Sequence, residues 1–535
     1  MHNKKLKYKF THVLLAMLLS VSLLTACTAN DSTVVGSSTS ATSGQTGVNG
    51  TSTTSGLTRT VSSTTKTDIS VDYNAEDEDS AWSSTGSTSI SLKSDTIAYE
   101  GNGVAVQNNI VTITSAGTYI INGTIRNGQL RVDTNDKAPV RLILNGANIT
   151  SLDSAPIYIT KAKKAVIVLA EGTKNSLTDS KTYTVEDKEA DEPNSTIFSK
   201  SDLTINGTGS LTVNANYKNA ITSKDELKVM SGNITVNSAG DGIRGRDFVA
   251  IKNGMVNINS QKDGIKSNND EDAEKGFVLI EGGTVNITAQ DDGIHADTSI
   301  EINDGNINIM KAYEGIESAK ITINNGNVYV LSNDDGINIS GGNYNSSLNI
   351  NGGYIYVESG GDGLDANGSI YMSNGTVVVN GPTSNFNASI DYDRAFKMTG
   401  GFLVAAGSAG MAQSPDTSST QNSAVISFTE TMSAGTIFNI QTAEGKQLLT
   451  IKPSRDYQTV VVSSPELIKG TNYDIYYGGS STGTEKNGLY TGGTYTVGTK
   501  YQSFSVSDTI TTIGAVGRGG PGRQGFMGNG KRRAP

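Results

Sequence analysis

The chain has only one cysteine, Cys27, among its 535 residues. No disulfide can form within a single chain, so the fold must be stabilised without one. Aromatic residues make up only 6% of the sequence and Trp82 is the one tryptophan, which does not suit a ligand site built on a tryptophan platform. The net charge of −10 argues against nucleic acid as a partner.

Long hydrophobic runs are also missing, apart from a largely apolar segment at Val13–Leu24 that is too short to span a bilayer as a stable helix. It ends in Leu24-Thr25-Ala26-Cys27, which resembles the bacterial lipobox. That resemblance implies cleavage before Cys27 and a diacylglycerol on its sulfur, and two acyl chains give stable anchoring. We therefore predict a lipoprotein signal peptide at 1–27 and a lipid-anchored protein on the extracellular face of the cell membrane. The preceding positive region contains Lys4, Lys5, Lys7 and Lys9.

The segment after Cys27 is rich in Ser, Thr and Gly and has almost no bulky residues up to about residue 66. Such a composition cannot bury enough apolar surface to order itself. We predict a flexible tether over 28–84. The acidic run Glu76–Asp79 within it is interpreted as a solvated loop.

A repeat organises the chain from Leu203 to about Ala406. Each copy contains two pairs of apolar residues, and one residue of any type separates the two members of a pair. A Gly-containing turn lies between the pairs, and a short third segment follows the second pair. The first pairs open with Leu227, Val249, Val278, Ile300, Ile321, Leu348 and Ile370, and the second with Ile234, Val256, Val285, Ile307, Val328, Ile355 and Val377.

Two-residue alternation predicts strands with one buried face. Three short strands per copy describe one coil, and stacked coils share a continuous core. The fold class is therefore all-β: a right-handed parallel β-helix of about ten coils over 85–410. A leucine-rich horseshoe is disfavoured because regular leucines and a helical return are missing. The first coils, before residue 200, are less regular, and Lys181–Asn194 is predicted to be a projecting loop.

The repeat stops beyond residue 410. Apolar alternation between Val425 and Val506 predicts antiparallel strands that form a C-terminal cap or small β-domain over 411–511. The residues 512–535 are rich in Gly and basic side chains, and we predict a disordered tail.

The third segment of most copies is an acid followed by Gly and Ile or Leu. Coils stack roughly 4.8 Å apart, so these acids should form a ladder of carboxylates. Like charges directly opposite each other are destabilising, and calcium accepts carboxylate ligands in irregular geometry. We predict calcium here, although each Asp can instead cap its own turn. The candidate metal residues are Asp241, Asp263, Asp270, Asp291, Asp292, Asp297, Glu314, Glu317, Asp334, Asp335, Asp362 and Asp365.

The residues that directly follow the inward Ile or Leu of each third segment should form a second column beside the carboxylate ladder. It runs from basic to acidic along the axis: Arg244, Lys266, His295, Glu317, Asn338 and Asp365. Arg244, Arg246 and Lys266 are the candidate ligand-binding residues of a local positive patch. His295 is the only histidine outside the predicted signal peptide and is interpreted as an inert surface residue.

The spacing between successive copies is longer than usual at two places, because residues are inserted there: Ser267–Asp272 and Ser340–Ser347. Both follow the third segment of a copy and so should leave the coil from the same face. Insertions on one face of a solenoid commonly mark its binding side.

Over 85–510 the sequence resembles exported, mainly clostridial carbohydrate-binding β-helix proteins, which are related in fold to pectate-lyase-like polysaccharide lyases. The segments that carry the resemblance are Ala116–Gly123, Leu142–Gly146, Ser199–Gly207, the Asp-Gly-Ile series and Tyr473–Gly493. The resemblance implies binding of plant cell-wall polysaccharide, including acidic pectic chains such as polygalacturonate, with calcium bound along the helix.

We therefore expect a monomeric polysaccharide-binding lipoprotein. Two alternatives stay open: a calcium-dependent polysaccharide lyase, and a structural surface or spore-coat protein without glycan affinity. A lyase needs a base that is neutral near the working pH. Lys266 and Arg244 are the weak candidates for it, but the neighbouring carboxylates favour their charged forms, so we expect no lyase activity.

Overall fold

The computed structural model of the chain describes residues 69–189, 191–341 and 345–514. Within them the fold is all-β, with strands β1 to β48 and one short helix, α1 (Ala75–Glu78). No helix in this part of the chain is long and apolar enough to cross a membrane. The predicted signal peptide with Cys27, the tether up to residue 68 and the tail from residue 515 lie outside the described residues.

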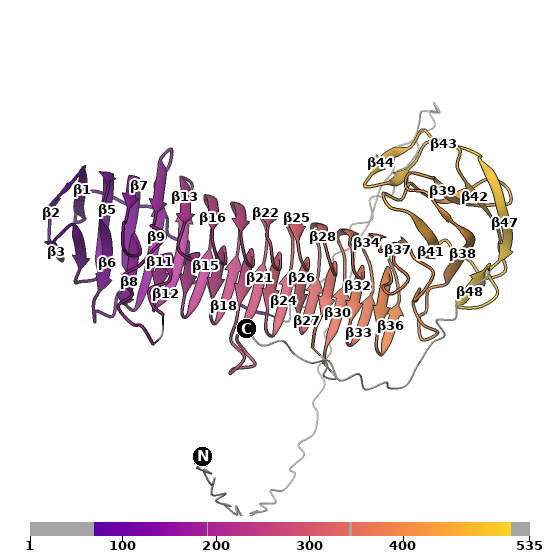
Figure 1. Cartoon of the computed structure of the whole chain (residues 1–535), viewed down its shortest axis with the longest axis horizontal. Helices are drawn as coiled ribbons and strands as arrows, with labels where there is room; N and C mark the ends of the chain where they lie inside the picture. Colours follow the sequence, from indigo (N-terminus) through magenta and orange to yellow (C-terminus); the bar gives the residue numbers. More distant parts are fainter. Residues whose placement is uncertain (1–68, 190, 342–344, 515–535) are drawn as a thin grey trace, which may run out of the picture. The chain divides into compact units, whose positions relative to one another are not determined.

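The predicted parallel β-helix is confirmed, and its coils stack in sequence order (Figure 1). Each regular coil contributes one strand to each of three faces. The first face consists of β9 (Lys164–Leu169), β12 (Asp202–Gly207), β15 (Glu226–Val229), β18 (Phe248–Ile251), β21 (Phe277–Ile280), β24 (Ser299–Ile302), β27 (Lys320–Ile323), β30 (Ser347–Ile350), β33 (Ser369–Met372) and β36 (Ala395–Met398).

The second face follows the first after a Gly-containing corner. It consists of β10 (Lys174–Thr178), β13 (Ser210–Ala215), β16 (Asn233–Ser238), β19 (Met255–Ser260), β22 (Thr284–Thr288), β25 (Asn306–Ala312), β28 (Asn327–Ser332), β31 (Tyr354–Glu358), β34 (Thr376–Asn380) and β37 (Phe402–Gly407).

The third face is a separate 13-stranded sheet, which corresponds to about twelve coils rather than the predicted ten. After β3 (Val104–Gln107) it consists of β4 (Ile110–Ile113), β6 (Gln129–Asp133), β8 (Ile157–Lys161), β11 (Ser195–Ser199), β14 (Asn219–Ser223), β17 (Ile243–Gly245), β20 (Ile265–Ser267), β23 (Ile294–Ala296), β26 (Ile316–Ser318), β29 (Ile337–Ile339), β32 (Leu364–Ala366) and β35 (Ile390–Tyr392).

The first coils are less regular, as the sequence predicts. The long strands β5 (Gly117–Ile125) and β7 (Val140–Thr150) each run from the first face into the second. At the start of the helix, β1 (Thr88–Ser94) pairs in parallel with β5 and antiparallel with β2 (Thr96–Glu100). This hairpin covers the edge that an open solenoid end would expose.

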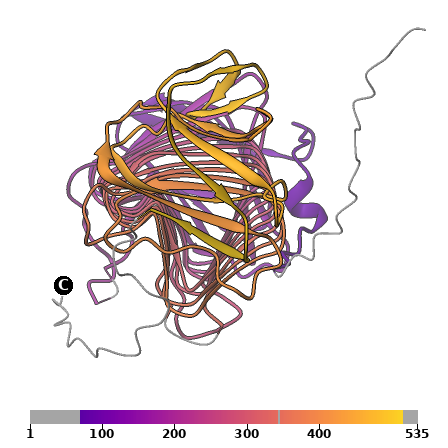
Figure 2. The same ribbon diagram turned by 90° about the vertical axis from the view of Figure 1, so that its right-hand side faces the viewer.

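Apolar side chains that point inward stack in columns between the faces, and Figure 2 shows the coils from their C-terminal end. On the third face Ile243, Ile265, Ile294, Ile316 and Ile337 align in register and all are fully buried. Gly254 shows why the corners need glycine. Its φ is +109°, and a Cβ there would lie 2.7 Å from the carbonyl oxygen of Gly232 in the preceding coil.

Residues 69–79, which we call the N-terminal strap, pack along the first face. Ile69, Val71 and Tyr73 contact an apolar cluster that contains the stacked rings of Phe248 and Phe277. The backbone N–H of Ile69 donates to Oε2 of Glu301 at 3.0 Å. The prediction of a flexible tether reaching residue 84 is therefore wrong for this segment.

Asp77 fixes the other end of the strap. It is fully buried, and its carboxylate pairs with Lys164 at 2.8 Å and with Lys228 at 3.5 Å. Although burial alone raises the pKa of this carboxyl, the hydrogen bonds of Lys164 and Thr204 hold it below its usual range. The interpretation of Glu76–Asp79 as a solvated loop is thus wrong for Asp77, because two buried lysines on the coils require an anion.

The C-terminal strands pair antiparallel, as the sequence predicts, except for β38 (Ser423–Met432) and β48 (Ile510–Ile513), which pair in parallel. β38, β41 (Tyr457–Ser463) and β48 extend the sheet beyond β37, and β43 (Ser480–Ser481) pairs with β46 (Tyr495–Thr496). A six-stranded sheet contains β39 (Phe438–Thr442), β40 (Gln447–Ile451), β42 (Asn472–Tyr477), β44 (Thr484–Lys486), β45 (Leu489–Thr491) and β47 (Thr499–Ser505).

The C-terminal region shares an apolar core with the second face of the last coils. Tyr356, Val378 and Val404 point outward from β31, β34 and β37 and pack against residues such as Phe438 and Val462. The second face is therefore covered at its C-terminal end.

Candidate functional site on the third face

The carboxylate ladder forms at the corner before the third face. The acid of each copy lies two residues before an aligned apolar residue, from Ile243 to Leu364. One oxygen of several acids caps the corner of the next coil. Oδ1 of Asp263 accepts the backbone N–H of Asp292 at 3.2 Å, and Oδ1 of Asp335 accepts that of Asp362 at 2.6 Å. Turn capping is thus one role of these acids, and it occupies one carboxylate oxygen.

In the basic half of the ladder the remaining oxygen faces a cation of the second column. Arg244 pairs with Asp241 at 3.3 Å, and Lys266 forms a close ion pair with Asp263. Arg246 is paired with Glu271, from the first insertion, at 2.5 Å. All three residues of the predicted positive patch are therefore ion-paired.

Lys266 is held in its charged form. Burial alone would lower the pKa of its ammonium, but the charge and hydrogen bond of Asp263 outweigh that effect and raise the pKa. A lysine with a raised pKa is a weaker candidate for a base near neutral pH.

His295 lies at the transition from basic to acidic residues. Its Nδ1 lies 2.8 Å from Oε2 of Glu317 and 3.1 Å from Oδ2 of Asp292, and its Nε2 lies 3.3 Å from Oδ1 of Asp297. Burial would lower the pKa of the imidazole, but these three carboxylates raise it to about 11. Burial raises the pKa of Glu317, but His295 brings it down to about 2. His295 therefore acts as a cation that neutralises acids of the ladder.

In the part of the chain that the structure describes, no lysine, arginine or histidine pairs with Asp335, Asp362 or Asp365 in the acidic half. Burial raises the pKa of Asp362 to about 6 and that of Asp365 to about 7, and neighbouring carboxylates push both in the same direction. Burial likewise raises the pKa of Glu314 to about 8, although Nδ2 of Asn338 donates to its Oε2 at 2.7 Å. These raised pKa values mark a region in which partly buried carboxylates crowd one another.

Asp391 extends this region by one coil and was missed by the sequence reasoning. It aligns with Asp365 in the second column and accepts a hydrogen bond from Nε2 of Gln413 at 2.7 Å. The coil lacks the acid-Gly-Ile pattern because Ala388 and Ser389 replace the acid and the glycine. The sequence signal that could have identified Asp391 is the inward Ile390, because the residue after each inward Ile or Leu belongs to the second column.

Three groups of side chains bring their possible ligand atoms within 4.8 Å of one another: Asp335 with Asp362 and Asp365, Asp263 with Asp291 and Asp292, and Asp292 with His295 and Glu317. The first group offers only carboxylate oxygens, the ligands that calcium takes, so its donor set fits the predicted ion. The other predicted metal residues belong to none of these groups; they are Asp241, Asp270, Asp297, Glu314 and Asp334.

Tyr183 and Glu192 anchor the loop Lys181–Asn194 to the N-terminal end of the third face, while most of its other described side chains are exposed. Its Glu192 is buried and pairs with Lys200 at 2.7 Å and Lys224 at 3.0 Å. Tyr183 packs against the buried pair Tyr158 and Phe198. The polar composition of the loop did not indicate these contacts, because the residues that the loop contacts lie on other coils.

Parts of the chain are similar to known proteins. A curated protein of Acetivibrio thermocellus (strain ATCC 27405), described as a carbohydrate-binding domain-containing protein, is 45% identical over 137 residues, which is 26% of this chain. The chain spans about half the length of that relative, 48%. A solved structure, "Structure of the polysaccharide lyase-like protein from C. thermocellum, Gadolinium derivative", is 38% identical, with a TM-score of 0.41 over 45% of this chain and 92% of that one.

A family model described as "Carbohydrate-binding domain-containing protein" matches residues 107–346 and 311–499. These matches together extend over well more than half of the 535 residues and include almost all of the coils. The chain therefore belongs to the family of carbohydrate-binding domain-containing proteins.

Proposed function

We propose that this protein binds an acidic polysaccharide, such as polygalacturonate, through calcium held in the acidic half of the third face. The observation that carries the proposal is the group Asp335, Asp362 and Asp365, whose ligand atoms lie within 4.8 Å of one another. Apart from burial, the influences that raise the pKa of Asp365 are all carboxylates. A divalent cation would relieve this repulsion.

The same geometry supports a bridging role for the ion. Calcium takes six to eight oxygen ligands. Two of the six oxygens of these three carboxylates already cap corners, Oδ1 of Asp335 and Oδ1 of Asp362, so the group leaves positions open on the ion. Carboxylates of an acidic sugar chain are suitable ligands for those positions. Calcium thereby overcomes the repulsion between an acidic glycan and a protein of net charge −10.

The ion pairs of the two candidate bases favour binding over lyase chemistry. Arg244 and Lys266 are both ion-paired, and the pKa of Lys266 is raised. Neither is poised to remove a proton from a sugar near neutral pH. We therefore propose no lyase activity, and the assay is ultraviolet absorbance from unsaturated products on polygalacturonate with calcium. A steady rise that disappears in Lys266→Ala would make the protein an enzyme.

We further propose that the protein is a monomer held at the extracellular face of the membrane by lipid on Cys27. The support is the lipobox-like sequence Leu24–Cys27 and the positive segment before it. Metabolic labelling with a radioactive fatty acid tests this, and Cys27→Ser should abolish the label and release the protein from the membrane fraction.

Retention on immobilised polygalacturonate tests the central proposal. We expect retention in calcium, loss of retention in excess chelator, and weak retention in magnesium, which demands a more regular octahedral geometry. Failure to bind any acidic glycan in calcium would favour the alternative of a structural surface protein without glycan affinity.

A further inference from the structure

The first face carries a column of side chains that point away from the core and are nevertheless buried. Its members align in successive coils and are at most 4% exposed; they are Thr204, Lys228, Ala250, Leu279 and Glu301. The N-terminal strap contacts this column from Thr204 at one end to Glu301 at the other. We call the column, together with Lys164, Phe248 and Phe277, the strap-binding surface.

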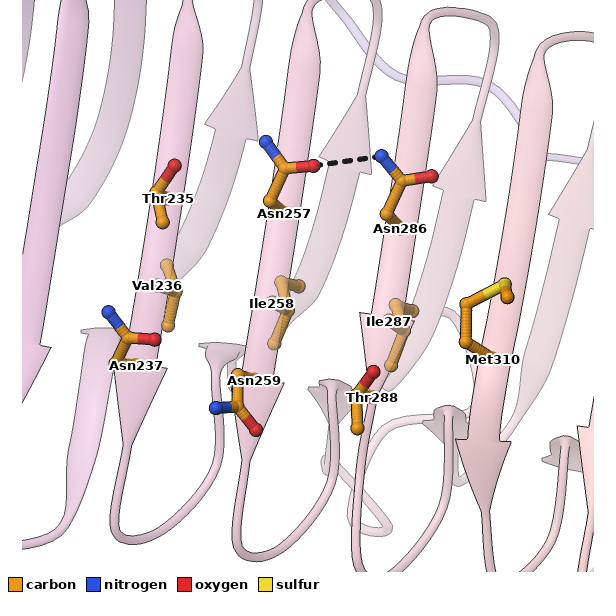
Figure 3. A pocket seen from close by; sticks show the side chains of 10 residues that line it. All are labelled: Thr235, Val236, Asn237, Asn257, Ile258, Asn259, Asn286, Ile287, Thr288 and Met310. Carbon is orange, nitrogen blue, oxygen red and sulfur yellow. Dashed lines mark hydrogen bonds between the residues drawn. The ribbon is translucent and has the colours of Figure 1, made fainter.

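Apolar residues occupy the middle of the strap-binding surface. The rings of Phe248 and Phe277 stack with their centres 4.8 Å apart, on the outside of two successive coils. The second face of the same two coils turns Asn257 and Asn286 outward instead, and both amides are partly exposed (Figure 3). Outward apolar residues are therefore not a general feature of these coils, and they mark the face that the strap covers.

The strap presents apolar side chains that fit this surface. Ile69, Val71 and Tyr73 alternate with polar residues, so an extended chain turns all three to the same side. All three pack against the cluster that contains Phe248 and Phe277. Two alternating apolar residues followed by an aromatic residue are thus the first element that the surface recognises.

The carboxylate of Asp77 is the second element. It is fully buried, accepts from Nζ of Lys164 at 2.8 Å and lies 3.5 Å from Nζ of Lys228. The hydroxyl of Thr204 donates to it as well. Asn74 caps the short helix α1 and orients this carboxylate, because its backbone N–H donates to Oδ2 of Asp77 at 3.2 Å. The coils thereby form a site for one acid, four residues after the aromatic residue.

Side chains of the coils also bind the main chain of the strap, whose described residues belong to no strand. Nζ of Lys228 donates to the carbonyl oxygen of Asp72 at 2.8 Å. Oε2 of Glu301 accepts the N–H of Ile69 at 3.0 Å. Main-chain contacts of this kind add affinity for any extended peptide, whereas the apolar and acidic contacts add specificity.

An exposed loop joins the strap to β1. Every side chain from Ser80 to Gly86 is exposed, and the only tryptophan of the chain, Trp82, lies among them. Exposed loops of small and polar residues are preferred sites of proteolytic cleavage. A cut in this loop breaks the covalent connection but removes none of the contacts by which the coils recognise the strap.

From these observations we propose that the first face is a peptide-binding site whose occupant is the strap of the same chain, held as a separable ligand. A protein cut in the loop after the strap therefore stays assembled as two chains, and the coils remain attached to the residues before 69. The site recognises a peptide and uses neither the acids of the third face nor calcium, so it is independent of the function proposed above.

Cleavage of the full chain at a chosen position tests this proposal. A recognition sequence for a specific protease is inserted after Ser84, and the protein is captured by a tag at its C-terminus and cut. Because Trp82 belongs to the N-terminal fragment and the coils contain no tryptophan, the tryptophan fluorescence left on the captured protein measures the bound fragment. We expect the fragment to stay bound through repeated washing. Its complete loss on cutting would overturn the proposal.

Variants distinguish binding at this surface from trapping of the fragment elsewhere. Asp77→Ala removes the buried carboxylate and Val71→Asp places a charge against the apolar cluster, so each should release the fragment at least about tenfold faster. Glu78→Ala is the matched control, since its pair with Lys252 is exposed, and it should release the fragment as slowly as the wild type. If Asp77→Ala does not fold, Val71→Asp carries the test. Equal release from the variants and the wild type would overturn the proposal.

Discussion

Oδ1 of Asp335 accepts the backbone N–H of Asp362 at 2.6 Å, so one acid of the ladder caps the corner that carries the next. Asn219 plays the same part earlier in the column, where its Oδ1 accepts the N–H of Asp241 at 2.9 Å. Capping therefore needs only a carbonyl-like oxygen, whereas the negative charge of the acids requires another explanation. We propose calcium binding as that explanation.

The first prediction separates capping from charge at Asp335. Asp335→Asn keeps the corner hydrogen bond and removes the charge, so without calcium its stability should equal or exceed that of the wild type. Asp335→Ala leaves the partly buried N–H of Asp362 without its side-chain partner and should cost about 1 kcal/mol or more. Chemical denaturation in chelator measures both. Equal destabilisation by both variants would contradict the assigned role of the charge.

The second prediction concerns pH in the absence of calcium. The folded state raises the pKa of Asp362 to about 6, Asp365 to about 7 and Glu314 to about 8. The folded state therefore binds more protons than the unfolded state, and the contribution of these groups to stability is lost as pH rises through the folded values. We expect the melting temperature in chelator to fall between pH 5 and pH 8.

Calcium should abolish that fall, because an ion bound to the carboxylates stabilises their charged forms. For each site, calcium at 100 times its dissociation constant adds about 2.7 kcal/mol to the stability. Differential scanning fluorimetry over this pH range, with calcium and with chelator, measures the difference. Identical pH profiles in the two buffers would exclude calcium from the acidic half.

The third prediction concerns the N-terminal strap. Asp77→Ala removes the anion that pairs with Lys164 and Lys228, whose side chains are only 5% exposed. Breaking a buried pair in this way should cost about 3 to 5 kcal/mol and increase hydrogen exchange along the strap. Glu78→Ala is the control, since its pair with Lys252 is exposed and should contribute less than about 1 kcal/mol. Similar effects of the two substitutions would mean that Asp77 does not hold the strap.

The fourth prediction concerns the positive patch. Replacing Arg244, Arg246 and Lys266 together by alanine should weaken retention on polygalacturonate, because positive charge near the glycan is lost. The loss should be modest, since all three side chains are already paired with acids. Retention assays at several salt concentrations measure it. Undiminished retention would place the acidic-glycan site away from these residues.

The coils and the second column were predictable because they depend on short-range periodicity. Ile243 to Leu364 align as the repeat indicates, and the residues after them form the expected column from Arg244 to Asp365. The contacts of Asp77 were not predictable in this way. Its partners Lys164 and Lys228 are 87 and 151 residues away in the sequence, and local composition indicated only a polar segment.

One missed feature did leave a signal in the sequence. The run Val377-Val378-Val379 interrupts the alternation of apolar and polar residues on the second face. Apolar residues on both sides of a strand indicate that both sides are covered. Val378 is indeed buried against the C-terminal region.

Titration of polygalacturonate into the protein by calorimetry, with calcium and with chelator, tests the central claim most directly. The comparison is between the wild type and a variant that combines Asp362→Asn with Asp365→Asn, and Asp95→Asn, at an exposed turn far from the ladder in the sequence, is the control. We predict calcium-dependent binding by the wild type and the control, and a loss of at least about 1.4 kcal/mol, or tenfold in affinity, in the double variant. Binding that is equally strong in chelator, or unchanged in the double variant, would contradict calcium-bridged recognition at this site.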